Sequence, residues 1–210
     1  MKVSVSYITS KYKKKETIKL IDKSNCDYIH VDLMDGIYVN NKNFTISEVI
    51  NDLSNTSKLL DVHLMVNNPD KYISKLGTLN INDIIFHPST SKNIRKTIEL
   101  IKSMGFLVGL AINPDEDIHI IDEYLSDIDI VLIMSVVPGL GGQEFIPSVI
   151  DKIDYLSNYD LIISIDGGIN EESINYLIDK KIDILVSGSY ICMSDNYNSN
   201  INKLLEFNKK

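Results

Sequence analysis

Short apolar runs recur along the chain and alternate with segments in which apolar residues are three or four positions apart. The second pattern is typical of amphipathic helices, as in Ile94, Ile98 and Ile101. The runs themselves have the length and aliphatic content of buried strands. There are eight of them: residues 3–8, 28–32, 59–65, 84–87, 107–112, 130–135, 161–166 and 182–188.

Eight strands, each followed by a helix, within 210 residues predict a particular α/β fold. The expected architecture is a single (β/α)8 TIM barrel that spans residues 1–210 as one domain. An open doubly wound sheet is the structural alternative. The chain contains no linker, low-complexity tract or sequence repeat that would divide it further.

Composition and charge narrow the classes of function. The net charge of −8 disfavours nucleic acid as a partner, and the one basic cluster, residues 11–15, is interpreted as a solvated loop. No apolar run approaches the ~18 residues that span a bilayer, and no signal-peptide pattern is present, so we expect no membrane association. Two cysteines, Cys26 and Cys192, are too few for a disulfide framework, which favours a cytoplasmic protein.

Polar side chains lie at the ends of three predicted strands. His30 and Asp32 point to the same face of the second strand because successive side chains alternate. The same alternation directs His63 inward on the third strand, and Asp166 ends the seventh. Since active sites of TIM barrels lie at the C-terminal ends of the strands, we expect these four side chains to meet at one opening.

Two imidazoles and two carboxylates form a suitable ligand set for one divalent ion, Zn²⁺, Fe²⁺, Mn²⁺ or Co²⁺. Such an ion would offset the cost of burying the charges. Each residue alone could instead be an ordinary hydrogen-bonded group. Four such side chains that point into the same opening favour the metal site. His87 also ends a strand and is interpreted as supporting this site, whereas His119 is expected on the surface of a helix.

Glycines cluster in the three loops that follow the sixth, seventh and eighth strands. Their backbone N–H groups can approach an anionic ligand closely, and TIM barrels often bind phosphate in this region. Ordinary turn glycines are the alternative for any single loop. The predicted phosphate-binding residues are Gly139, Leu140, Gly141, Gly142, Gly167, Gly168, Gly188 and Ser189.

Several long segments, in the same order along almost the whole chain, resemble those of the ribulose-phosphate 3-epimerase family. They are residues 30–36 (HVDLMDG), 61–66 (DVHLMV), 109–114 (GLAINP), 134–147 (MSVVPGLGGQEFIP), 166–169 (DGGI) and 186–189 (VSGS). The resemblance implies a barrel of the ribulose-phosphate-binding type and a catalytic domain. It also implies a small sugar phosphate as substrate and a homo-oligomer, either a dimer or a hexamer.

The resemblance further implies roles for individual residues. His30, Asp32, His63 and Asp166 would hold the metal, and Asp32 and Asp166 would also be the acid/base pair. Ser6 and His63 would contact the substrate, and Met34, Met65 and Met134 would line the pocket, although these methionines could equally be ordinary core.

The family's reaction, epimerisation at C3 of a 2-keto sugar phosphate, requires this layout. One carboxylate would remove the proton beside the carbonyl and the other would return a proton to the opposite face. The metal would stabilise the negative ene-diolate as a Lewis acid, and the remote phosphate would hold the sugar in place. The pentose phosphate pathway reaction, D-ribulose 5-phosphate to D-xylulose 5-phosphate, is therefore the expected activity.

Three positions depart from the family pattern and leave alternatives open. Asn40 stands where the family usually has proline, Ser89 lies near the position of an acid, and Val137 replaces a polar residue. A hexulose phosphate such as allulose 6-phosphate is therefore an alternative substrate, and a non-catalytic phosphate-binding barrel is an alternative of another class. A decarboxylase relative is disfavoured because residues 32–35 contain no lysine to protonate a carbanion.

Overall fold

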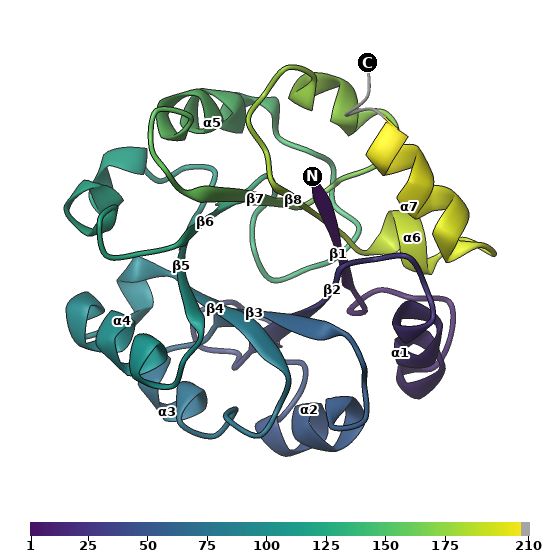
Figure 1. Ribbon diagram of the computed structural model, residues 1–210, viewed down its shortest axis with the longest axis horizontal. Helices are drawn as coiled ribbons and strands as arrows, with labels where there is room; N and C mark the ends of the chain where they lie inside the picture. The colour runs from purple at the N-terminus through teal and green to yellow at the C-terminus, as the bar shows by residue number, and fades with distance from the viewer. Residues whose placement is uncertain (207–210) are drawn as a thin grey trace.

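A computed structural model describes residues 1–206, so the last four residues of the predicted domain lie outside this description. Eight parallel strands close into a barrel, in which β1 pairs with both β2 and β8 (Figure 1). The predicted TIM barrel is confirmed, and the open doubly wound sheet is wrong because the sheet closes on itself. The strands are β1 (Lys2–Ser6), β2 (Tyr28–Met34), β3 (Leu59–Met65), β4 (Ile81–Phe86), β5 (Leu107–Ile112), β6 (Ile130–Met134), β7 (Ile162–Asp166) and β8 (Ile184–Ser187).

Helices follow the strands along the chain and surround the barrel (Figure 1). The α-helices are α1 (Lys14–Asp22), α2 (Ile46–Leu53), α3 (Asp70–Ile73), α4 (Ile94–Ser103), α5 (Ile150–Leu156), α6 (Ser189–Cys192) and α7 (Tyr197–Glu206). Short 3₁₀ helices complete the ring: η1 (Pro88–Thr90), η2 (Ile118–Tyr124), η3 (Pro147–Val149) and η4 (Ser173–Leu177). Among residues 1–206, no helix has both the length and the apolar character needed to cross a bilayer.

The alternation of side chains along the strands produces two separate apolar cores. Ile29 and Val31 belong to the core that packs the strands against the helices. Tyr28 and Leu132 belong to a second core, which fills the inside of the barrel. His30, which lies between Ile29 and Val31, must therefore point into the barrel, as its position in the sequence predicted.

Several local predictions need correction. The second strand continues to Met34 rather than ending at residue 32, and the eighth covers Ile184–Ser187 rather than residues 182–188. The first strand ends at Ser6 rather than at residue 8. The fourth strand begins at Ile81 rather than at residue 84, because Asp83 continues the strand as a buried side chain. The basic cluster is not entirely a loop, since Lys14 and Lys15 form the first turn of α1, where Lys14 pairs with Asp52 at 2.6 Å.

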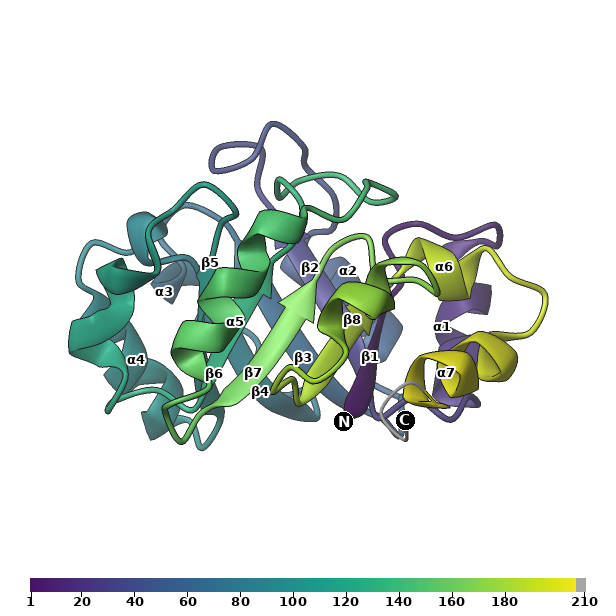
Figure 2. The same ribbon diagram turned by 90° about the horizontal axis from the view of Figure 1, so that it is seen from above.

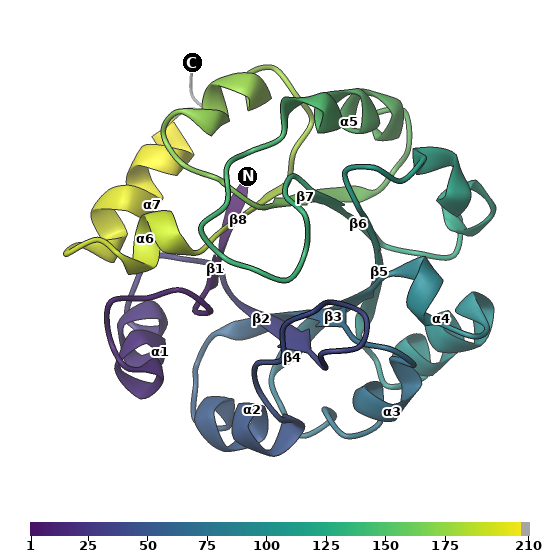
Figure 3. The ribbon, with the colours of Figure 1, turned by 180° about the vertical axis from the view of Figure 1, so that it is seen from behind.

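Two loops, which follow β2 and β6, project beyond the C-terminal end of the barrel (Figure 2). Figure 3 looks onto this end and shows both loops in front of the strands. They contact each other, since the Asn41 side-chain amide donates to the carbonyl oxygen of Gly139 at 3.1 Å. The loops form a rim around the opening at which the polar strand ends meet.

Candidate active site

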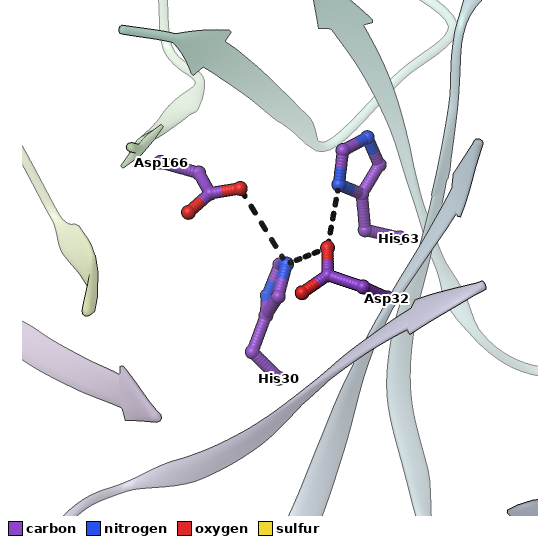
Figure 4. Close-up of side chains that lie close together, drawn as sticks. All are labelled: His30, Asp32, His63 and Asp166. Atoms are coloured by element: carbon purple, nitrogen blue, oxygen red, sulfur yellow. Dashed lines mark hydrogen bonds and ion pairs between the residues drawn. The ribbon is translucent and has the colours of Figure 1, made fainter. Parts of the chain in front are cut away.

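The structure brings together the four predicted metal ligands at the C-terminal ends of β2, β3 and β7 (Figure 4). One atom from each of His30, Asp32, His63 and Asp166 lies within 4.8 Å of the corresponding atom of every other. His30 Nε2 and His63 Nδ1 each lie 3.3 Å from Asp32 Oδ1, and His30 Nε2 lies 3.9 Å from Asp166 Oδ2. Both imidazoles and Asp32 are buried, and Asp166 is partly exposed.

This donor set fits a divalent transition metal. Ligands at tetrahedral positions about 2.1 Å from an ion would lie roughly 3.4 Å apart, close to the separations found here. His30 Nε2 is buried and has no hydrogen-bond partner within the described part of the chain. An unpaired buried nitrogen is costly unless a ligand satisfies it. The four residues can therefore hold one metal ion.

Asp61 fixes the orientation of the His30 ring by contacting its Nδ1 atom. In the ladder between β2 and β3, His30 pairs with Asp61 and Asp32 pairs with His63. His30 Nδ1 lies 2.7 Å from Asp61 Oδ2, so this carboxylate directs Nε2 toward the ligand cluster. The sequence analysis did not single out Asp61, although its position two residues before His63 on the same strand face was a usable signal.

A second carboxyl group, Asp83 on β4, lies beside Asp61 in the ladder. Burial and the charge of Asp61 raise the pKa of Asp83 well above its usual value. Burial also acts on Asp61, but the charge of His30 and its hydrogen bond lower that pKa. These opposite shifts favour the ionised form of Asp61, beside His30, and the protonated form of Asp83.

His63 is also held by a second group. Its Nε2 lies 2.9 Å from Nε2 of His87, which follows β4. Burial lowers the pKa of both imidazoles, that of His87 strongly, so both rings are neutral near pH 7. This contact places His87 next to a ligand, where the sequence analysis expected it, whereas His119 lies on the surface in η2.

The two aspartates differ in protonation. Burial would raise the pKa of Asp32, but His30 and His63 lower it far below its ordinary value. Burial raises the pKa of Asp166 to about 7, with the charge of Asp32 adding to the effect and that of His30 opposing it. In the absence of a metal, Asp32 is thus a carboxylate, while Asp166 can carry a proton near neutral pH.

Above the ligand cluster lies a pocket of about 550 Å³. Fourteen of the sixteen predicted site residues line it, all except the deeper His30 and His63: Ser6, Asp32, Met34, Met65, Met134, Gly139, Leu140, Gly141, Gly142, Asp166, Gly167, Gly168, Gly188 and Ser189. Ser6 Oγ donates to Asp32 Oδ2 at 2.7 Å, which links the predicted substrate-contact residue to one of the two predicted acid/base residues. Met34, Met65 and Met134 are apolar and buried, and contribute to the pocket lining.

The glycine loops approach one another so closely that side chains would not fit. A Cβ atom on Gly167 would lie 2.4 Å from Val136 Cγ2, and one on Gly168 would lie 2.5 Å from the backbone nitrogen of Phe145. Both glycines also have positive φ, +120° and +65°, a region that glycine adopts readily. The result is a backbone-lined end of the pocket, which suits an anionic phosphate.

The sequence analysis missed some pocket residues, notably Thr9 and Gln143. Gly141 packs against Thr9, whose Oγ1 lies within 2.1 Å of where a Cβ would be. Gln143 donates to the carbonyl oxygens of Val137 and Leu140, at 2.6 and 2.8 Å, and shapes the loop after β6. Thr9 lies in the loop that follows the end of β1 at Ser6.

The three departures from the family pattern lie away from this pocket. Asn40 and Val137 line a separate shallow hollow at the rim, together with Tyr38. Ser89 lies in η1 and is near the Tyr38 hydroxyl, since a hydrogen bond between them affects the Tyr38 pKa. None of them contacts the ligand cluster.

Fold and site together define a (β/α)8 barrel whose C-terminal end carries a pocket and four residues that can hold one divalent metal ion. The family model described as "Ribulose-phosphate 3 epimerase family" matches residues 2–192. The ribulose-phosphate 3-epimerase of Buchnera aphidicola subsp. Baizongia pistaciae is 42% identical over 190 residues, 85% of this chain and 82% of the relative. That of Bacillus subtilis is 37% identical over 183 residues, 83% of each chain. The chain belongs to the ribulose-phosphate 3-epimerase family.

Solved structures with much lower identity share the fold. The crystal structure of KGPDC from Streptococcus mutans superposes with a TM-score of 0.72 at 12% identity, covering 99% of this chain and 97% of that one. At this identity the likeness shows the barrel architecture alone.

Proposed function

We propose that this protein, with residues 1–210 as one catalytic domain, interconverts D-ribulose 5-phosphate and D-xylulose 5-phosphate. The observation that carries the proposal is the cluster of His30, Asp32, His63 and Asp166 at one end of the pocket. The backbone of the glycine loops lines the other end. The names of the two relatives support the same activity. A cytoplasmic location and a homo-oligomeric state stay predictions.

The two aspartates supply the acid/base chemistry. Epimerisation removes the C3 proton from one face of the sugar and returns a proton to the other, so one group must be ionised while the other is protonated. In the metal-free protein the pKa values of Asp32 and Asp166 already differ in this way, since that of Asp32 is lowered and that of Asp166 is raised to about 7. They approach His30 from different directions in Figure 4, and a substrate above His30 would lie between them. In the reverse reaction the roles exchange.

The metal ligands proposed for a divalent Zn, Fe, Mn or Co ion are His30 Nε2, Asp32 Oδ1, His63 Nδ1 and Asp166 Oδ2. When bound, this ion supplies Lewis-acid stabilisation of negative charge on the substrate oxygens. Asp61 and His87 orient the two imidazoles from outside the cluster.

Positioning of the substrate rests on the remaining pocket residues. Gly139, Leu140, Gly141, Gly142, Gly167, Gly168, Gly188 and Ser189 surround the end of the pocket proposed for the phosphate. Ser6 would contact the sugar, and Met34, Met65 and Met134 would exclude water from the reacting carbon. Binding energy from the phosphate would thereby be used to orient C3 between the carboxyl groups.

The proposal is tested by a coupled assay of the purified protein reconstituted with Fe²⁺, Zn²⁺, Mn²⁺ or Co²⁺. We expect turnover of D-ribulose 5-phosphate, with a higher kcat/KM than for D-allulose 6-phosphate. A preference for the hexulose phosphate would reassign the substrate. No turnover and no deuterium incorporation at C3 with any of the four metals would indicate a non-catalytic phosphate-binding barrel.

A further inference from the structure

A buried contact between two histidine rings sets a condition on how His63 can bind a metal. The Nε2 atoms of His63 and His87 lie 2.9 Å apart. Two ring nitrogens at this distance form a hydrogen bond only when one carries a proton and the other offers a lone pair. The tautomers of the two rings are therefore coupled: the proton position on one ring determines that on the other.

The other nitrogen of His63 faces the ligand cluster. His63 Nδ1 lies 3.3 Å from Asp32 Oδ1, on the side where His30 and Asp166 also present their ligand atoms. A metal ligand must offer a lone pair, so Nδ1 of a metal-bound His63 is unprotonated and its neutral ring carries the proton on Nε2. That proton can only be donated to a group that accepts, and His87 Nε2 lies in the required position.

We propose that His87 is a positioning residue that accepts a hydrogen bond from His63 Nε2–H and thereby fixes the tautomer that presents His63 Nδ1 to the metal. This inference rests on the proposed function, because it concerns the same metal site. It assigns a role in metal affinity to a residue that is not a ligand.

The surroundings of His87 restrict its ring. The side chain is fully buried, and the ring of Tyr38 packs against it at 4.7 Å between centroids. Tyr38 is itself held by the Asn113 side-chain amide, which donates to its hydroxyl at 2.8 Å. His87 Nδ1 is buried and has no hydrogen-bond partner among residues 1–206. Nε2, which faces His63, is thus the ring nitrogen with a polar partner, and when it accepts the hydrogen bond the proton of the neutral His87 ring lies on Nδ1.

A purely structural role makes a different prediction. If His87 mattered only as a buried ring, phenylalanine would replace it better than glutamine. If it matters as an acceptor, glutamine would be the better replacement, since its amide oxygen can reach a similar position. Comparing His87→Gln with His87→Phe therefore separates the two roles, and His119→Phe, at an exposed histidine, is the matched control.

The first measurement is the dissociation constant of Zn²⁺ without substrate, by competition with a chelating dye. We expect His87→Phe to bind about 10- to 100-fold more weakly than wild type, and His87→Gln and His119→Phe to stay within about threefold. Equal affinity of His87→Phe and wild type, or a loss in His87→Gln as large as in His87→Phe, would overturn the proposal. If His87→Phe does not fold, His87→Gln still decides: a loss of tenfold or more rejects the acceptor role.

The second measurement uses wild-type protein alone. In protein labelled with ¹⁵N and loaded with ¹¹³Cd²⁺, the resonance split by cadmium identifies the ligating nitrogen of each histidine. We expect the splitting at Nδ1 of His63 and a protonated Nε2 on the same ring. Splitting at Nε2 of His63 would overturn the inference. Because neither measurement involves turnover, protein that binds the metal in this way but does not epimerise would reject the proposed function and leave the role of His87 intact.

Discussion

Asp61 Oδ2 lies 2.7 Å from His30 Nδ1, so a carboxylate that no substrate can reach determines which nitrogen of His30 faces the candidate metal site. Asp61 is buried, at 1% exposure, and lies next to Asp83 in the ladder between β3 and β4. Two buried residues that are not among the four proposed ligands thus contact the histidines of the site. Asp61 contacts His30, and His87 contacts His63.

Replacing Asp61 with asparagine tests this dependence. The substitution keeps the shape of the side chain but removes the negative charge that stabilises the proton on His30 Nδ1. We expect Asp61→Asn to bind Zn²⁺ or Mn²⁺ about 10- to 100-fold more weakly than wild type, measured by titration calorimetry. Asp83→Asn is the matched control, because the raised pKa of Asp83 favours its protonated form and asparagine resembles a neutral carboxyl group. An equally large loss in both variants would contradict the role given to Asp61.

Metal binding should release protons in a pH-dependent way. The pKa of Asp166 is raised to about 7, and that of His30 is raised well above its usual value by Asp61 and Asp32 despite its burial. Both groups must lose their protons to become ligands, so metal affinity falls as the pH is lowered below 7. Calorimetry in buffers of different ionisation enthalpy measures the number released. We expect metal binding to release more protons at pH 6 than at pH 8. The Asp166→Asn variant should release about one proton fewer than wild type at pH 6. A number of released protons that does not change with pH would be inconsistent with these pKa values.

The raised pKa of Asp166 also affects the stability of the metal-free protein. The folded pKa of Asp166 lies above its unfolded value of about 3.9, so ionising Asp166 is unfavourable in the folded state. Its contribution therefore lowers the free energy of unfolding progressively as the pH rises from about 4 to about 7. Asp166→Asn should be more stable than wild type at pH 8 and similar to it at pH 4, by urea denaturation without metal. A stability difference that grows toward low pH would have the wrong sign.

Gly168 should matter for phosphate binding because of its backbone position. An alanine Cβ there would lie 2.5 Å from the backbone nitrogen of Phe145, at a φ of +65°. We expect Gly168→Ala to lose about 1–3 kcal/mol of stability and to raise KM for the sugar phosphate roughly tenfold or more. Gly105→Ala is the control: φ is +84°, but no atom lies within 4 Å of the added Cβ, and the site is remote. It should lose some stability and keep its KM; a similar KM in both variants would argue against a phosphate site at Gly168.

Much of the fold could be predicted because aliphatic strands and their alternation are local properties of the sequence. The inward direction of His30, Asp32 and His63 follows from alternation alone. Alternation also places Asp61 on the inward face, but its contact with His30 depends on the register between β2 and β3, which is a property of the assembled barrel. The start of β4 was missed for a related reason. Asp83 resembles a loop residue in sequence, but in the barrel it pairs with Asp61 on one side and Leu107 on the other.

Substituting either catalytic aspartate should abolish turnover without unfolding the barrel. Asp32→Asn and Asp166→Asn each remove a group that must exchange a proton with C3, so kcat should fall by at least about 10²- to 10⁴-fold. Circular dichroism and thermal unfolding monitor the fold, and the bound metal is quantified in each variant at saturating metal. Activity close to wild type in either variant would reject the assignment of that residue.

The central claim, that two carboxyl groups act on opposite faces of C3, is tested most directly by hydrogen exchange during turnover. Metal-loaded protein converts D-ribulose 5-phosphate in D₂O, and the C3 position of both sugars is analysed by NMR at low conversion. We predict that the D-xylulose 5-phosphate formed carries deuterium at C3, while the recovered D-ribulose 5-phosphate remains largely unlabelled. A product that retains the original C3 hydrogen would mean that a single group carries the proton from one face to the other, which would contradict the pairing of Asp32 with Asp166.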